Sequence, residues 1–255
     1  MCLTNYIKVL IGSLTILTLT TLVSVNSFAS IGEVKIHKGN AVIDRKDGDQ
    51  GIKVEKDLGV FSYDTVKTGN GKVGIAFIDE TRVDVTEHSK LVIDEFVYDP
   101  NTKTGALSLK ASLGTVRYAS GQIAKNSKQN LKIKTPTATI GVRGTDFTMT
   151  IDETGSSTII LLPSCDTNGN CYVGEIDVTS DAGQVILSQA FQATVVETVA
   201  SNPMKPVILD LDEKLIDNLL IISKPKEIQK QQNKEDYVKV ANALEIDFLE
   251  FDDLE

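Results

Sequence analysis

Apolar and polar residues alternate with a period near two from Ile31 to about Val196. This alternation predicts strands that bury one face, and turn-forming pairs such as Asn70-Gly71 separate them. Many short strands at this spacing predict an all-β core, folded as a roll or a sandwich. The predicted strands are Glu33–Ile36, Asn40–Asp44, Val73–Ile78, Arg82–Thr86, Leu91–Tyr98, Ala106–Leu109, Gly114–Tyr118, Leu131–Lys134, Phe147–Ile151, Thr158–Leu162, Glu175–Thr179 and Gln184–Leu187.

An internal echo offers a second interpretation of the same strands. The segment Val66–Ile75 aligns without a gap on Ile133–Val142, and both patterns predict a strand, a tight crossing and a second strand. Shorter echoes appear at Ile31–Val34, Leu113–Val116 and Val173–Ile176. Related units that stack on one another would form a short β-solenoid, which is the alternative to the compact roll or sandwich.

The pattern changes after Pro203 and Pro206. Leu211, Leu215, Leu219 and Ile222 recur at spacings of four, four and three, which predicts a helix over Asp210–Ser223 with one apolar face. Lys224–Lys234 has the composition of a solvated linker. In the last segment, Glu235–Glu255, acidic residues alternate with hydrophobic ones, so it is either a frayed tail or a docking segment for a basic groove, carried by Phe248, Leu249 and Phe251.

The N-terminus has the layout of a secretory signal peptide. Lys8 precedes an apolar run from Val9 to Val25, and Ser27-Phe28-Ala29 supplies small residues for cleavage after Ala29. An uncleaved anchor that leaves the protein on the inner membrane, facing the periplasm, is the alternative. The expected organisation is a signal peptide at 1–29, a β domain at 30–152, a β continuation at 153–200, and a helical segment, linker and acidic tail at 201–255.

Charge and composition narrow the class of partner. The chain has 26 basic and 35 acidic residues, a pI near 4.9 and no Trp, whereas a nucleic-acid-binding protein presents a basic surface. No nucleic-acid partner is expected. The low aromatic content also argues against a carbohydrate-binding platform.

Two cysteines remain after removal of the signal peptide, because Cys2 is lost with it. Five residues separate Cys165 and Cys171, which lie between strand-like runs, and in an exported protein this predicts a disulfide at a hairpin tip. The closed loop is short, so the bond contributes only about 2 kcal/mol. A calcium loop built on the alternating Asp166, Asn168 and Asn170 is the competing interpretation.

Catalytic chemistry has little support in the sequence. His37 and His88 are the two histidines, and neither accompanies a nucleophile motif; adjacent His88 and Ser89 do not place a hydroxyl against an imidazole. No Cys/His cluster, phosphate-binding loop or zinc motif is present, so neither a metal nor a cofactor is expected. A spatial pair of carboxylates, and with it a hydrolase, stays open as an alternative.

The most distinctive stretch runs from Ile133 to Phe147. Pro136, Gly141 and Gly144 suit a tight crossing, and Arg143 lies three residues from Asp146. One interpretation makes Arg143 and Asp146 a structural brace, with a large loss of stability in Arg143→Ala. The other makes Arg143 a receiver for an anion, helped by Lys125, Lys128, Lys132 and Lys134.

This stretch, T-P-T-A-T-I-G-V-R-G-T-D-F, resembles the signature of the FecR domain family. Ordered elements before it also resemble that family: Gly32–Val34, Asn40–Val42, Asp64–Gly69, Phe77–Thr81 and Leu113–Val116. The resemblance covers roughly Ile31–Ile151, and Ser164–Val178 is similar to a cysteine-bearing continuation in some relatives. Glu80 stands where the family has Gly, which predicts a wider turn.

The resemblance implies a periplasmic β module that binds a protein partner in the cell envelope, with a role in signalling. Well-known members also control a sigma factor through a cytoplasmic N-terminal part, whereas only seven residues precede Lys8 here, so that second role is not expected. We therefore expect an exported, non-enzymatic binding or scaffold module of unknown oligomeric state. A carbohydrate- or cell-wall-binding module and a hydrolase with a carboxylate pair are the alternatives.

Overall fold

A computed structural model describes residues 29–211, apart from 47, 128 and 166–169. Strands make up nearly all regular structure in this part of the chain, and the helix described in it, α2 (Gln122–Asn126), has five residues. The all-β core is confirmed. The predicted signal peptide lies outside the described residues, as does all but the start of the predicted C-terminal helix. Within the described residues no helix is long and apolar enough to cross a membrane.

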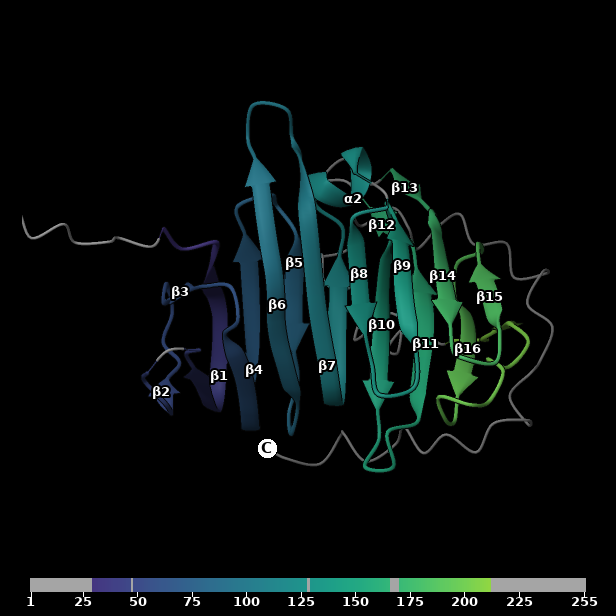
Figure 1. The fold of residues 1–255 in the computed structure, drawn as a ribbon, viewed down its shortest axis with the longest axis horizontal. Helices are drawn as coiled ribbons and strands as arrows, with labels where there is room; N and C mark the ends of the chain where they lie inside the picture. The colour runs from purple at the N-terminus through teal and green to yellow at the C-terminus, as the bar shows by residue number, and fades with distance from the viewer. Residues whose placement is uncertain (1–28, 47, 128, 166–169, 212–255) are drawn as a thin grey trace, which may run out of the picture.

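Fifteen strands join into one hydrogen-bonded sheet that folds over on itself into two layers. The layers overlap in Figure 1, because the view looks through both of them. The first layer, here called the front sheet, contains one part of each of three long strands, β1 (Gly32–Asp44), β4 (Thr65–Phe77) and β7 (Thr104–Ala119). Its other strands are β15 (Gln184–Leu187), β14 (Glu175–Thr179), β9 (Thr139–Arg143), β8 (Leu131–Lys134), β6 (Lys90–Asp99) and β2 (Ile52–Lys53).

The second layer, the back sheet, contains the remaining parts of the same three long strands. Its other strands are β17 (Val207–Ile208), β16 (Gln192–Val196), β11 (Ser157–Leu162), β10 (Asp146–Ile151), β5 (Arg82–Val85) and β3 (Gly59–Val60). Strands from the region 153–200 therefore pair with strands of the region 30–152 in both layers. A separate two-stranded ribbon, β12 (Ser164–Cys165) and β13 (Cys171–Tyr172), lies at the same end as α2 (Figure 1).

The long strands change layers at sharp bends. The first residues of β4 pair with β6, for example Lys67 with Lys90, and its last residues pair with β5, for example Val73 with Val85. Backbones meet closely at the bends of β1 and β4, where a side chain on Gly39 would lie 2.0 Å from the carbonyl oxygen of Asn70. The tight crossing predicted within Val66–Ile75 is confirmed.

The second copy of the echo has a different shape. β8 and β9 pair as an antiparallel hairpin in the front sheet, closed by a bond from the Thr135 N–H to the Ala138 carbonyl. Among the described pairs, only β7 with β8 is parallel. The echo is therefore a similarity of pattern and not a stacked repeat, and the sandwich describes the fold better than the solenoid.

The core lies between the two layers and follows the alternation seen in the sequence. Inward side chains such as Val34, Ile75, Leu109, Val142 and Phe147 are almost wholly buried. A smaller apolar cluster lies on the outer side of the back sheet: Ile160, Leu162, Phe191 and Ala193, with Leu209 and Leu211 packed against it. β17 lies just before the predicted helix, and residues 210 and 211, the described start of that helix, are not helical.

The bend of β7 gives a test of this architecture. Gly114 has a φ of 80°, and a side-chain carbon placed on it would lie 2.0 Å from the Ser89 hydroxyl oxygen. We expect Gly114→Ala to lower the free energy of unfolding by about 2 kcal/mol or more, because strain and a clash add. Gly141→Ala is the matched control: the nearest atom would lie at 3.7 Å, so its stability should change by less than about 1 kcal/mol. Equal urea midpoints for the two variants would contradict the bend.

Candidate functional site

The residues of the distinctive stretch meet at one end of the sandwich. This α2 end is formed by the β4–β5 turn (78–81), the segment 120–126 with α2, and the β9–β10 crossing (143–146). Strands leave one layer here and enter the other, so their last backbone groups need partners that the ladders do not supply. Buried acidic and hydroxyl side chains provide those partners.

Asp79 connects the β4–β5 turn to the helix. Its carboxylate accepts bonds from the Thr81 N–H (3.1 Å), the Thr81 hydroxyl (2.8 Å) and the Ile123 N–H (3.2 Å), while its carbonyl accepts the Gln122 N–H (2.7 Å). Asp79 and Thr81 are fully buried. Two free donors at the start of α2 are thus satisfied by a turn about forty residues earlier in the chain.

The β4–β5 turn is tight, so the wider turn predicted from Glu80 is wrong. The Phe77 N–H donates to the Thr81 carbonyl (2.9 Å), and the Glu80 N–H donates to the Phe77 carbonyl (3.0 Å). Glu80 adopts a φ of 71°, the left-handed conformation for which Gly is the usual residue. Its side chain accepts a bond from Gln122 (2.7 Å), which helps to hold the glutamate in this conformation.

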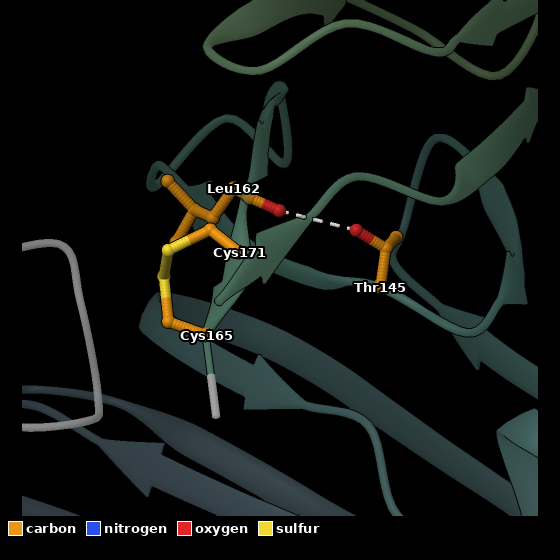
Figure 2. Close-up of a disulfide and its surroundings, with 4 residues drawn as sticks. All are labelled: Thr145, Leu162, Cys165 and Cys171. Atoms are coloured by element: carbon orange, nitrogen blue, oxygen red, sulfur yellow. Dashed lines mark hydrogen bonds between the residues drawn. A yellow bond between two sulfur atoms is a disulfide. The ribbon is translucent and has the colours of Figure 1, made fainter. Parts of the chain in front are cut away.

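Thr145 and Asp146 fix the β9–β10 crossing. Asp146 is 7% exposed and accepts the Ser120 N–H (2.9 Å), while the Ser120 hydroxyl donates to the Thr145 carbonyl. The Thr145 hydroxyl donates to the Leu162 carbonyl (3.1 Å), as Figure 2 shows. Burial raises the pKa of Asp146, and the bond from the Ser120 N–H opposes that rise.

The structure does not bring Arg143 and Asp146 together, so the predicted pairing of these two residues is wrong. Arg143 forms an ion pair with Glu175 on the neighbouring strand β14, and its side chain is 54% exposed. The reason is the strand period: Arg143 lies on the outer side of the front sheet, whereas Asp146 follows the crossing and faces the α2 end. Of the lysines expected to help Arg143, Lys125, Lys132 and Lys134 are exposed, and Lys128 lies outside the described residues.

The fork-shaped brace expected from the sequence exists at another pair. Arg45 forms an ion pair with Asp64 through Nη1, donates from Nη2 to the Gly59 carbonyl (2.9 Å), and lies 4.6 Å from the centre of the Phe61 ring. The Asp64 carboxylate is 1% exposed and also accepts the Phe61 N–H (2.8 Å). Burial raises the pKa of Asp64, against these bonds and the charge of Arg45.

Cys165 and Cys171 form the predicted disulfide, which joins β12 to β13 (Figure 2). The bond closes the ribbon beside the Thr145–Leu162 contact. Residues 166–169, on which the calcium interpretation depends, lie outside the described residues. The proposed docking residues Phe248, Leu249 and Phe251 also lie outside them.

The Ser89 hydroxyl forms hydrogen bonds within a turn. It donates to the Glu87 carbonyl (2.9 Å) and accepts the Thr115 N–H (3.1 Å), while His88 has a φ of 50° and gives its N–H to the Gly69 carbonyl (3.0 Å). No group of three or more His, Cys, Asp or Glu residues arranged to hold a metal ion occurs in the described part of the chain.

Part of the chain matches a known protein family. Residues 64–162 match the family described as "FecR protein". This part of the chain is similar to the FecR family. The matched segment contains Asp79, Thr81, Thr145 and Asp146 and parts of both layers of the sandwich, whereas Arg45 and the strands β1, β2, β3 and β14 to β17 lie outside it. None of the curated proteins compared with the chain matches it.

Two crystal structures of a protein described as a candidate anti-sigma factor, from Parabacteroides distasonis ATCC 8503, align with TM-scores of 0.40 and 0.41 at 10% sequence identity. Each alignment covers 55% of this chain and 57% of that protein, so the chain spans less than two thirds of its length.

The sequence predicted the tight crossing at Gly144 but not the groups that form hydrogen bonds to the crossing and to the β4–β5 turn. Ser120 and Ile123 contribute backbone N–H groups, which leave no mark in residue type. Asp79 and Thr81 belong to the family-like element Phe77–Thr81, whose match to the family was the available signal for this turn.

Two arginine substitutions distinguish the real brace from the predicted one. Arg45→Ala leaves a buried Asp64 without its cation, and we expect it to cost roughly 3–5 kcal/mol in urea unfolding. Arg143→Ala removes an exposed pair and should cost less than about 1 kcal/mol. A larger loss in Arg143→Ala than in Arg45→Ala would contradict this assignment.

The pKa of Asp146 predicts a pH dependence of stability. Because folding raises this pKa above the ordinary value of 3.8, the contribution of Asp146 is complete below that value and is lost as pH rises through the folded pKa. Asp146→Asn keeps an acceptor for the Ser120 N–H and does not ionise. We expect its stability relative to wild type to increase from about pH 3 to about pH 7 in urea melts. A constant difference across this range would contradict the prediction, because it would mean that the pKa of Asp146 is the same in the folded and the unfolded protein.

Proposed function

We propose that this protein is an exported FecR-type module that contacts a protein partner in the cell envelope, takes part in signalling and catalyses no reaction. The match of residues 64–162 to the FecR family carries this proposal, because that family implies an extracytoplasmic binding domain. The N-terminal signal pattern of residues 1–29 supports export, with cleavage after Ala29.

The use of the buried polar residues supports a binding role over a catalytic one. Asp64, Asp79 and Asp146 each accept backbone N–H bonds, which ties them to turns and crossings. Their carboxylates serve as anchors for loops, whereas a hydrolytic pair needs two carboxylates facing a common substrate space. Recognition then falls to the exposed outer faces and loops of the sandwich.

The front sheet offers the broader candidate surface for a partner. Most of its outward residues on β6, β7, β8 and β9 are polar or charged, with the apolar Val92 and Val97 among them, whereas the outer side of the back sheet buries Ile160 and Leu162 beneath Leu209 and Leu211. A polar, open sheet face suits a transient protein contact.

The test uses the mature chain, Ser30–Glu255, as bait in a detergent extract of the cell envelope. We expect one envelope protein to be enriched saturably and to be cross-linked to front-sheet residues, with a Lys132→Glu/Lys134→Glu bait as the matched control that loses it. Enrichment of peptidoglycan or polysaccharide instead would favour a cell-wall-binding module. Saturable hydrolysis in an activity screen would replace the proposal with an enzyme.

Export has its own measurement. Mass spectrometry of the protein from the periplasmic fraction should find Ser30 at the N-terminus. An intact Met1 on membrane-bound protein would mean that the leader stays as an anchor.

A further inference from the structure

Five lysines gather on the outer side of the front sheet, although the protein as a whole has a net charge of −9. They come from four neighbouring strand segments in β4, β6, β7 and β8, and alternate with inward residues of the core. We call them the lysine face: Lys67, Lys90, Lys110, Lys132 and Lys134.

The strand register sets lysine opposite lysine. Lys67 is the direct partner of Lys90 across β4 and β6, and Lys110 is the direct partner of Lys134 across β7 and β8. Like charges directly opposite each other destabilise a sheet, so this arrangement is unfavourable unless anions offset it.

Carboxylates on this side of the sheet offset only part of the charge. Asp44 pairs with Lys67, and Asp94 pairs with Lys110 at 2.6 Å. Glu95 lies opposite Ser108 at the β-bulge of β6. Within the part of the chain that the structure describes, Lys90, Lys132 and Lys134 form no close ion pair, although the charge of Lys90 helps to lower the pKa of Asp44 and that of Lys134 helps to lower the pKa of Asp94. Lys132 and Lys134 are exposed at positions two residues apart on one strand.

The chain carries a segment of complementary pattern outside the described residues. In the acidic tail, residues 245–255, Glu245 and Asp247 lie two residues apart, and so do Glu250 and Asp252. In an extended chain, residues two apart lie on the same side at about the separation of Lys132 and Lys134 on β8. Ile246 and Phe248 then fall on the side opposite Glu245 and Asp247, together with Glu250 and Asp252, so one acidic pair at a time can face the sheet.

We propose that the acidic tail, residues 245–255, binds the lysine face of the same molecule in an extended conformation. Its alternate carboxylates pair with Lys132 and Lys134 and with the lysines beside them. The tail thereby occupies the face that an acidic partner would need, and such a partner has to displace it.

The length of the connecting chain permits this contact. Residues 212–244 join Leu211, the last described residue, to the tail. Even if the predicted helix over Asp210–Ser223 forms, the residues that follow it can reach over about 70 Å when fully extended, more than the width of a domain of this size. A tether of this reach gives an effective concentration in the millimolar range, so even weak exposed ion pairs keep the tail on the face for part of the time.

The test measures how fast each lysine is acetylated in the full mature chain and in a chain that ends at Leu244. At low salt we expect Lys132 and Lys134 to react about twofold more slowly in the full chain, since a weak tether covers them about half the time. Salt of about 0.5 M should abolish the difference, because it screens exposed charges. Lys56 and Lys103, exposed in loops away from the lysine face, are internal controls that should react alike in both chains.

A charge-neutral tail separates electrostatic binding from other effects of truncation. In this variant every acid of residues 245–255 is replaced by its amide, and its hydrophobic residues stay. It should react like the truncated chain, and a synthetic peptide of sequence 245–255 added to the truncated chain should restore protection. Protection that increases with protein concentration would overturn binding within one molecule and assign the tail to a second copy. Equal acetylation of the full and truncated chains would overturn the proposal, and it would leave the proposed envelope partner untouched.

Discussion

Strands that pass from one layer to the other impose the main constraint on this fold, because every backbone group at a bend or crossing still needs a hydrogen-bond partner. The ladders supply partners only within a layer. Asp64, Asp79 and Asp146 supply them at the places where the chain leaves a layer, and each carboxylate accepts at least one backbone N–H. Burial of a carboxylate costs free energy of desolvation, and the hydrogen bonds from the loop offset that cost. Each of these aspartates is therefore favourable only beside the loop that it holds.

The residues of the family-like stretch have a structural role at these places. Thr145 and Asp146 anchor the β9–β10 crossing to Leu162 and Ser120, and Asp64 and Asp79 hold two further turns. All four residues lie in the segment that matches the FecR family.

The period-two pattern was enough to predict the all-β core and most strand positions, and the two cysteines expected in an exported chain were enough to predict the disulfide. It was not enough to predict which segments cross between layers, because Val66–Ile75 and Ile133–Val142 share a pattern yet form a bend and a hairpin. Arg143 and Asp146 are close in sequence, but the crossing at Gly144 sends them to different surroundings. The true Arg45–Asp64 brace joins residues nineteen apart. A pairing at that distance depends on how β1 meets β4, which residue spacing alone does not contain.

Because β1, β4 and β7 each belong to both layers, the two layers share covalent chain as well as a core. Neither layer can open without pulling on strands of the other, and the hydrogen-bond ladders break together. The sandwich thus behaves as one cooperative unit instead of two sheets that separate along their interface. A force applied to one layer is therefore passed to the other layer through the covalent chain as well as through the core.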